Sequence, residues 1–194
     1  MQCVRRSITG ASGNVSREVV KQALAVGLQV RATFQSPAVA AKAPVGLEGV
    51  IMDYAKPETI RPALHGVEKI LLVGPLVQNL PALEANFVKE VRRAGPKHIV
   101  KISALGGRES MFSIGHRDSE ENIEASGLAY TFLRPNGFMQ NLVNYNAGTI
   151  RSHKASGRRE QINWGGGIAW PPSDSRLTNV GPLTPRAAHD FVLR

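Results

Sequence analysis

Residues 7–17 have the sequence Ser7-Ile8-Thr9-Gly10-Ala11-Ser12-Gly13-Asn14-Val15-Ser16-Arg17, and this stretch decides the fold. A β-branched run leads into a turn with two glycines, and a helical pattern of apolar residues begins at Asn14 or Val15. Glycines let the backbone turn sharply and approach a ligand, while the first N–H groups of a helix attract negative charge. The stretch therefore predicts a strand, a tight turn and a helix that together bind a pyrophosphate.

Strand patterns and helical patterns alternate along the chain after this stretch. Further strands are predicted, from their apolar or alternating residues, at 28–34, 50–52, 69–73, 98–103 and 128–133. Helices are predicted between them, at 38–46, 57–64, 80–94 and 117–125. Such alternation is typical of a parallel sheet covered on both faces. We therefore predict an α/β fold with a Rossmann-like doubly wound parallel sheet over residues 1–150, followed by an irregular C-terminal extension over 151–194.

The net charge of +9 would suit nucleic acid, so its distribution matters. Residues 151–194 contain 7 Lys and Arg against 3 Asp and Glu, so the basic bias is denser in the extension. No zinc-finger or helix-turn-helix pattern accompanies this charge, and no aromatic residues are interleaved with the basic ones. We interpret the charge as a basic surface that also attracts anionic cofactors, which disfavours nucleic acid as a partner.

The composition predicts a cytoplasmic protein. No run approaches the roughly 18 apolar residues that a membrane span needs, and the amino end has no signal-peptide core. Cys3 is the single cysteine of the sequence, which excludes an internal disulfide. The five histidines stand at no metal-ligand spacing, so no metal is predicted.

Gly10 and Gly13 have the spacing of a dinucleotide cradle, and Ser16 stands where a third glycine would allow close packing. Their place between a strand and a helix favours cofactor binding over a purely structural turn. The end of the next strand normally selects the cofactor, because an acid there binds the ribose 2′-hydroxyl and an arginine accepts a 2′-phosphate. No acid lies within residues 28–36, so NADP(H) is favoured over NAD(H). Arg31 is either a cofactor residue or a solvated surface charge.

Three further polar residues lie at the ends of predicted elements. Asp53 is a candidate to accept a hydrogen bond from an adenine amino group, or to cap the helix that begins near residue 57. His116 precedes a predicted helix and is either a proton relay above the cofactor or a surface histidine. Ser103 is a candidate hydrogen-bond donor. No tyrosine with a lysine four residues later is present on a helix, so the acid–base pair of classical short-chain reductases is not predicted.

Three segments together resemble the NmrA-like family of atypical short-chain dehydrogenases: residues 8–15 (ITGASGNV), 97–106 (KHIVKISALG) and 124–141 (EASGLAYTFLRPNGFMQN). The resemblance extends over residues 1 to about 152. It implies an NAD(P)-binding Rossmann domain that acts either as a reductase of quinones or azo compounds or as a redox-sensing regulator. The end of the second strand departs from the family, because Gln35 stands where many relatives have arginine.

The resemblance also implies where the cofactor lies. The pyrophosphate would be held by Gly10, Gly13, Asn14 and Val15. The adenosine would lie beside Gly74 and Pro75. The nicotinamide would be surrounded by Ser103, His116 and residues 135–138, which include Pro135 and Asn136.

Two functions from different classes follow. The first is an NAD(P)H-dependent oxidoreductase that transfers hydride to a quinone, azo or similar conjugated small-molecule acceptor, with a proton from His116, Ser103 or water. The second is a non-catalytic NAD(P)-binding redox sensor that presents a changed surface to a regulatory protein partner. Family members continue into a smaller substrate-binding region, so residues 151–194 are interpreted as its remnant, through a truncation, a shifted reading frame or a divergent end.

Overall fold

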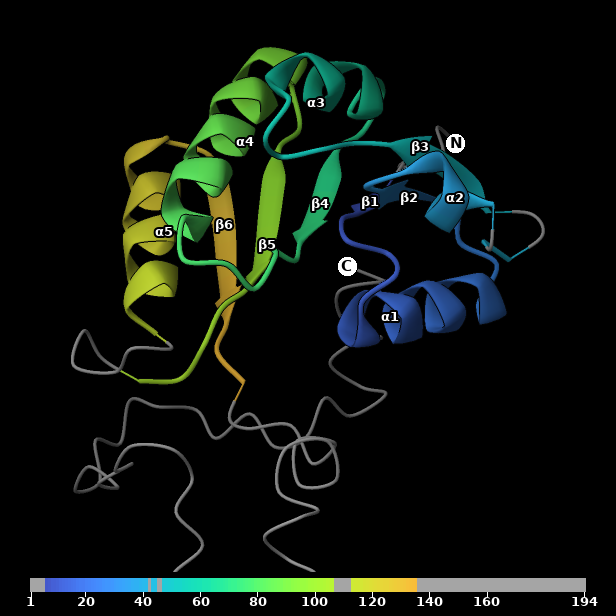
Figure 1. Ribbon diagram of the computed structural model, residues 1–194, viewed down its shortest axis with the longest axis horizontal. Coiled ribbons are helices and arrows are strands. Elements are labelled where there is room, and N and C mark those ends of the chain that lie inside the picture. Colours follow the sequence, from blue (N-terminus) through green and yellow to red (C-terminus); the bar gives the residue numbers. More distant parts are fainter. Residues whose placement is uncertain (1–5, 42, 45–46, 107–112, 136–194) are drawn as a thin grey trace, which may run out of the picture. The chain divides into compact units, whose positions relative to one another are not determined.

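The computed structural model describes residues 6–41, 43–44, 47–106 and 113–135 of the chain (Figure 1). Within these residues one sheet is formed by the strands β1 (Arg6–Ile8), β2 (Val30–Phe34), β3 (Glu48–Ile51), β4 (Lys69–Leu72), β5 (His98–Ile102) and β6 (Ala129–Leu133). The helices between them are α1 (Asn14–Ala25), α2 (Pro37–Ala40), α3 (Pro57–Ala63), α4 (Leu80–Ala94) and α5 (Ile114–Ala125).

The sheet has the strand order β3-β2-β1-β4-β5-β6, and all five strand pairs are parallel. The order reverses between β1 and β4, which lie side by side although three helices and two strands separate them in sequence. In such a sheet ligands bind beyond the carboxyl ends of the strands, near the point of reversal. The predicted Rossmann-like fold is confirmed, and the loop that follows β1 lies at that point.

Helices cover both faces of the sheet (Figure 1). An apolar core lies on each face. The first is formed by α1 and the inward residues of β1 and β2, with Ile8 and Ala32 fully buried. The second is formed by α3, α4 and α5 against β4 and β5, with Phe87 and Ile99 at its centre. Burial of this apolar surface is the main force that holds the layers together.

Element boundaries differ from the sequence prediction in places where packing decides the conformation. α4 spans the predicted residues and ends at Gly95, which has φ +93°, a left-handed conformation that suits glycine. In the alanine-rich segment after β2, the described residues form the single turn α2 rather than the longer helix predicted over 38–46. α5 begins at Ile114, three residues earlier than predicted, so His116 lies inside the first turn of a helix rather than in a loop before it.

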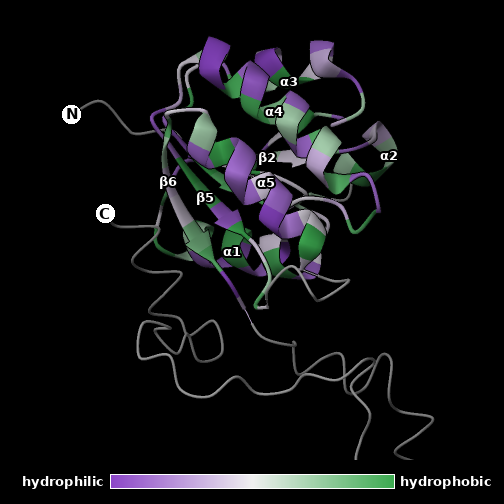
Figure 2. Ribbon diagram, turned by 90° about the vertical axis from the view of Figure 1, so that its left-hand side faces the viewer, coloured by the Kyte–Doolittle hydropathy of each residue, from purple (hydrophilic) through white to green (hydrophobic). Residues whose placement is uncertain are grey.

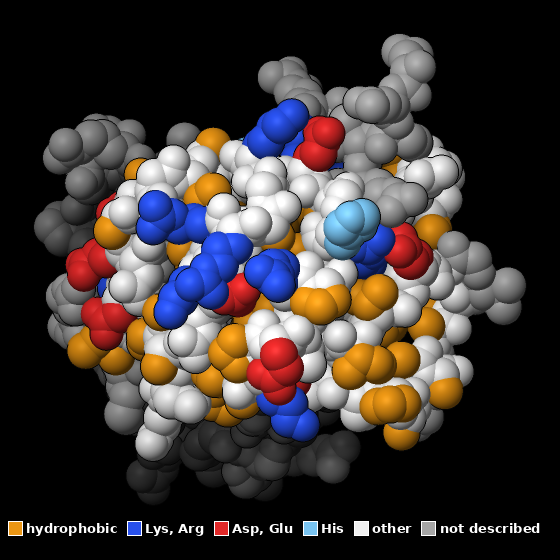
Figure 3. Space-filling view, turned by 90° about the horizontal axis from the view of Figure 1, so that it is seen from above, with side chains coloured by type: hydrophobic (Ala, Val, Ile, Leu, Met, Phe, Trp, Pro, Cys, Tyr) orange, Lys and Arg blue, Asp and Glu red, His pale blue; other side chains and the backbone are white. Residues whose placement is uncertain are grey.

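Hydrophilic residues prevail on the outer sides of α4 and α5, as their amphipathic sequences require (Figure 2). On the face seen from above, Lys and Arg side chains gather together with Asp and Glu (Figure 3). Among the described helices none is long and apolar enough to cross a membrane.

Candidate functional site

The turn between β1 and α1 has the geometry of an anion cradle. Gly10 has φ +59°, and a Cβ atom there would lie 3.2 Å from the carbonyl oxygen of Val73. Gly13 is the N-cap of α1, which no side chain caps, so the first N–H groups of the helix have neither an intrahelical nor a side-chain partner. These donors and the positive end of the helix dipole suit a phosphate. The turn therefore fits the pyrophosphate of a dinucleotide.

Ser16 occupies the place of the third glycine and fits there without loosening the packing. Its side chain is fully buried, and its Oγ donates a hydrogen bond of 2.7 Å to the carbonyl oxygen of Thr9. The bond connects the first turn of α1 to the residue that follows β1. The departure from the glycine pattern thus becomes a structural contact between helix and strand.

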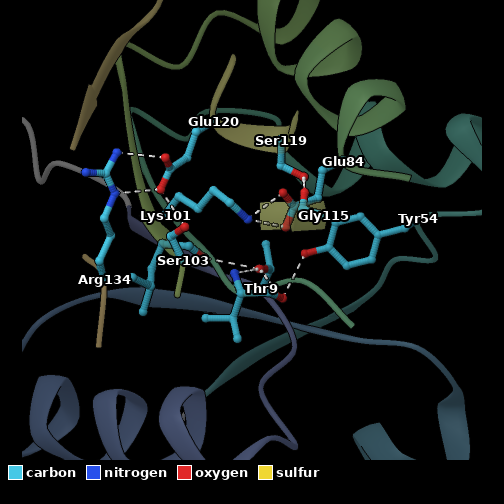
Figure 4. Close-up of polar contacts among 11 residues, drawn as sticks. Thr9, Tyr54, Glu84, Lys101, Ser103, Gly115, Ser119, Glu120 and Arg134 are labelled. Atoms are coloured by element: carbon cyan, nitrogen blue, oxygen red, sulfur yellow. Dashed lines mark hydrogen bonds and ion pairs between the residues drawn. The ribbon is translucent and has the colours of Figure 1, made fainter. Parts of the chain in front are cut away.

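Thr9 connects the cradle to the end of β4. Its Oγ1 lies 3.2 Å from the carbonyl oxygen of Leu71 and 3.3 Å from that of Val73, and it accepts a 2.8 Å hydrogen bond from the Val73 N–H. Tyr54 donates from its hydroxyl to the Val73 carbonyl over 3.1 Å (Figure 4). Burial raises the pKa of Tyr54, so the phenol keeps its proton for this bond. The cradle and the loop after β4 are therefore held in one arrangement.

A buried ion pair between β5 and α4 lies directly against the loop after β4. Lys101 of β5 and Glu84 of α4 are both fully buried, and the Nζ lies 2.8 Å and 2.5 Å from the two carboxylate oxygens (Figure 4). A Cβ atom on Gly74 would collide with Oε1 of Glu84 and would lie 2.5 Å from Cδ1 of Leu80. Gly74 is thus required by the ion pair, whatever it contributes to a cofactor.

A second charged cluster holds the ends of β5 and β6. Ser103 donates from Oγ to Oε1 of Glu120 over 2.5 Å. Arg134 donates to both oxygens of the same carboxylate, over 2.9 Å and 2.7 Å, and Arg117 donates to Oε2 over 2.5 Å. Burial alone would raise the pKa of Glu120, but the hydrogen bonds from Arg134 and Ser103 and the charges of both arginines lower it. The carboxylate is therefore ionised at neutral pH and fixes three segments at the carboxyl edge.

His116 lies close to both charged groups but shares a hydrogen bond with neither. Its Nδ1 atom is buried and has no hydrogen-bond partner in the described part of the chain. Burial and the positive charge of Lys101 lower its pKa to about 4, and the negative charge of Glu120 opposes this shift. The imidazole is therefore neutral at pH 7 and lacks the acidic second proton that an imidazolium would donate to an acceptor.

The side chain of Arg31 is bonded within the chain, at the end of the sheet opposite the cradle. Its guanidinium bonds Oε1 of Glu48 in β3 over 2.6 Å and 3.0 Å, and two backbone carbonyls after and at the end of α3, at 2.6 Å and 3.0 Å. The side chain is 6% exposed, so it is no solvated surface charge either. These carbonyls belong to the segment that enters β4, at the amino edge of the sheet and opposite the cradle. We therefore leave Arg31 out of the cofactor site.

Asp53 and Pro135 lie at the carboxyl edge. Asp53 accepts a 2.9 Å hydrogen bond from the Ala55 N–H through Oδ1, while the N-cap of α3 is Lys56, so Asp53 does not cap that helix. The Pro135 carbonyl accepts a 3.1 Å bond from the Leu105 N–H, which joins the segments after β5 and β6. Asn136 lies outside the described residues. No group of three or more His, Cys, Asp or Glu that could hold a metal occurs within the described ranges.

Sequence reasoning missed the residues that make the two charged clusters. Lys101 interrupts an apolar strand, and Glu84 lies on the same helical stripe as Leu80, Phe87 and Val91. A charge in each of two apolar patterns is the signal that could have identified the pair. The Glu120 cluster gave no comparable signal, since α5 is rich in charged residues throughout.

Comparison with known proteins agrees with this geometry. A family model described as NAD(P)H-binding matches residues 10–162. An NAD(P)H azoreductase of Xenophilus azovorans is 31% identical over 142 residues, which are 71% of this chain and 50% of the relative. The chain spans about half the length of the curated relatives that it matches.

Two solved structures share the fold at sequence identities close to that of the azoreductase. The triphenylmethane reductase of a Citrobacter species, solved with NADP(H), has a TM-score of 0.68 at 30% identity. The matched region is 78% of this chain and 55% of the reductase chain. The NADPH-dependent quinone oxidoreductase of Escherichia coli, solved with NADPH, has a TM-score of 0.70 at 27% identity and covers 76% of this chain and 54% of its own.

Proposed function

The chain belongs to a family of NAD(P)H-binding proteins related to azo and quinone reductases, and from this we propose that it is an NAD(P)H-dependent reductase of a quinone, azo or similar conjugated acceptor. The single observation that carries the proposal is the uncapped start of α1 behind a left-handed Gly10. Among the named relatives are reductases of azo compounds and quinones, which gives the acceptor class.

In this proposal the residues of the chain bind the cofactor and orient it. Gly10, Gly13 and the N–H groups of Asn14 and Val15 bind the pyrophosphate, and Thr9 holds the loop that contains Gly74 and Pro75 against the adenosine side. Asp53 keeps one carboxylate oxygen for the adenine amino group. When bound, the reduced nicotinamide supplies the hydride, as it does in the chemistry of this cofactor class.

The proton that completes a two-electron reduction is proposed to come from water. Ser103 already donates its hydroxyl hydrogen to Glu120, and His116 is neutral at pH 7. Ser103, His116 and Pro135 are therefore proposed to shape and dry the nicotinamide side of the site, and Arg134 and Glu120 keep Ser103 in place. The geometry supports a reductase that relies on orientation more than on acid catalysis.

The test is steady-state NADPH oxidation with menadione and with an azo dye as acceptors. We expect turnover by the wild-type chain and its loss in Gly13→Asp. Aspartate is a good N-cap, so the variant keeps α1, while its carboxylate occupies the same N–H groups and repels phosphate. Asn86→Asp adds the same charge on the exposed side of α4 and serves as the matched control with unchanged turnover. Tight NADPH binding without oxidation of any acceptor would contradict the reductase function.

A non-catalytic redox sensor is the second candidate function. It is favoured by the bonded state of Ser103 and the neutral state of His116, which leave neither residue as a ready proton donor. A regulatory protein partner would then recognise a surface that changes when the cofactor binds. The same experiment separates the two functions, because the sensor binds NADPH and oxidises none.

A further inference from the structure

A pocket of about 410 Å³ lies between α1 and the end of β2, directly beside the cradle. It shares Ala11 with the cradle turn, and the Ala11 N–H donates a 3.0 Å hydrogen bond to the carbonyl oxygen of Thr33 in β2. Phe34, the last residue of β2, lines its other wall. The pocket therefore lies where the pyrophosphate cradle and the cofactor-selecting strand meet.

The end of β2 has no charged group of its own to recognise a 2′-phosphate. Gln35 is exposed and neutral, and Arg31 is turned to the opposite edge of the sheet. No acid lies within residues 28–36 that would repel a phosphate or bind a ribose 2′-hydroxyl. Since no described residue at the end of β2 carries a positive charge there, we look for a cation that reads the 2′ position on the neighbouring element.

Two cations lie on the α1 side of this pocket. Arg17 and Lys21 are one helical turn apart and both line the pocket. Lys21 has a long, exposed contact of 3.9 Å with Glu18. Arg17 is exposed, and among the described residues no carboxylate pairs with it. Guanidinium groups bind phosphate oxygens in a planar, two-pronged geometry, so a free arginine beside the cradle suits a phosphate monoester.

We propose that Arg17, assisted by Lys21, binds the 2′-phosphate of NADPH, so that α1 rather than β2 discriminates NADPH from NADH. This inference rests on the proposed cofactor binding. In this proposal the edge of the adenosine moiety occupies the apolar pocket, and Arg17 and Lys21 lie on the α1 wall of that pocket. Gln35 replaces the arginine of many relatives without loss of the preference, because the charge is supplied one element earlier in the chain.

The test is a titration of the purified full chain with NADPH and, separately, with NADH, followed by cofactor fluorescence. The wild-type chain is expected to bind NADPH more tightly than NADH. Arg17→Gln is expected to weaken NADPH about 10- to 100-fold, the range of a lost hydrogen-bonded charge, and to leave NADH within about twofold. Lys21→Gln is expected to weaken NADPH less, because the ammonium is a point charge without the guanidinium fork.

Controls separate a local effect from a general one. Arg92→Gln removes an equally exposed cation from α4 and is expected to leave both affinities unchanged. Adenosine 2′,5′-bisphosphate should compete with NADPH more strongly than 5′-AMP in the wild type, and this advantage should vanish in Arg17→Gln. The thermal unfolding midpoint of Arg17→Gln should equal that of the wild type, since the exposed side chain has no hydrogen bond or ion pair with the described residues.

Each contrary result identifies what failed. Equal weakening of NADPH and NADH by Arg17→Gln overturns the inference and assigns Arg17 to the shared pyrophosphate. Unchanged affinities, or a wild-type preference for NADH, overturn it as well while the proposed cofactor binding stands. A wild-type chain that binds neither cofactor overturns both the inference and the proposed function.

Discussion

The two halves of the carboxyl edge are built by different means. Between β1 and α1 the cradle consists of backbone, with glycines, free N–H groups and a helix dipole. At the ends of β5 and β6 the edge consists of charged side chains, and the two buried carboxylates are Glu84 and Glu120. The first half is ready for an anion, while the second already satisfies its own charges. The half between β1 and α1 is thus arranged to bind an anion, and the half at β5 and β6 is arranged to hold its own loops in position.

The largest loss of unfolding free energy is expected from Lys101→Met, in the half of the edge that is built from charged side chains. The variant leaves the fully buried Glu84 carboxylate without a partner, which costs about 3–5 kcal/mol of unfolding free energy. Urea unfolding measures the loss. Lys101→Met/Glu84→Gln removes both charges at nearly constant volume and should recover most of the stability. If the single variant is as stable as the wild type, the pair is not a buried support.

The next effect concerns Glu120→Gln and the pH dependence of stability. The folded-state pKa of Glu120 lies below its ordinary value of 4.5, so its contribution is present above that pH and is lost as pH falls through the folded pKa. The variant should lose about 2 kcal/mol at neutral pH, typical of hydrogen bonds to a charged group, and progressively less as the pH falls below the ordinary value of 4.5. Unfolding free energies at a series of pH values measure this difference. Equal losses at all pH values would contradict the ionised cluster.

A smaller effect is expected in the cradle half from Ser16→Ala. The variant removes the buried hydrogen bond to Thr9 and should lower the unfolding free energy by about 1 kcal/mol, with little change in NADPH affinity. Ser12→Ala, an exposed position in the same turn, is the matched control and should be neutral. A strong loss of affinity in Ser16→Ala would show that side chains, and not only backbone, build the cradle.

The smallest effect is expected from His116 between pH 6 and pH 8. With its pKa lowered to about 4, the imidazole should show no change in NMR chemical shift over this range. Its stability contribution should be complete above the ordinary value of 6.5 and decline as pH falls toward 4, because the unfolded chain takes up a proton that the folded chain refuses. A midpoint near 6.5 would make His116 an available proton relay.

The sequence predicts the fold and the cradle well because both depend on local patterns. The apolar strands, the amphipathic α4 and the glycines of the cradle are each recognised from residues that are close together in sequence. The fold class, the family and the NAD(P)H-binding class are confirmed, whereas the preference for NADP(H) and the site residues remain predictions.

The sequence could not predict contacts between segments that meet only in the folded chain. Arg31 stood on a strand beside the expected cofactor, yet its partner Glu48 and the α3 carbonyls turn it to the other edge. The sequence predicts Ser103 as a candidate hydrogen-bond donor, but nothing in it indicates that Glu120, seventeen residues later, accepts this bond. Side-chain orientation at long range is set by tertiary packing and is invisible to local periodicity.

Gly74, Glu84 and Lys101 have a consequence for the evolution of this chain. A side chain at Gly74 requires the Glu84 carboxylate to withdraw, and that withdrawal strands the ammonium of Lys101 in the core. A side chain at Gly74, or the loss of one partner of the ion pair, is therefore expected to lower the stability of the fold. A lineage descended from this sequence should therefore keep all three residues or replace them as a set.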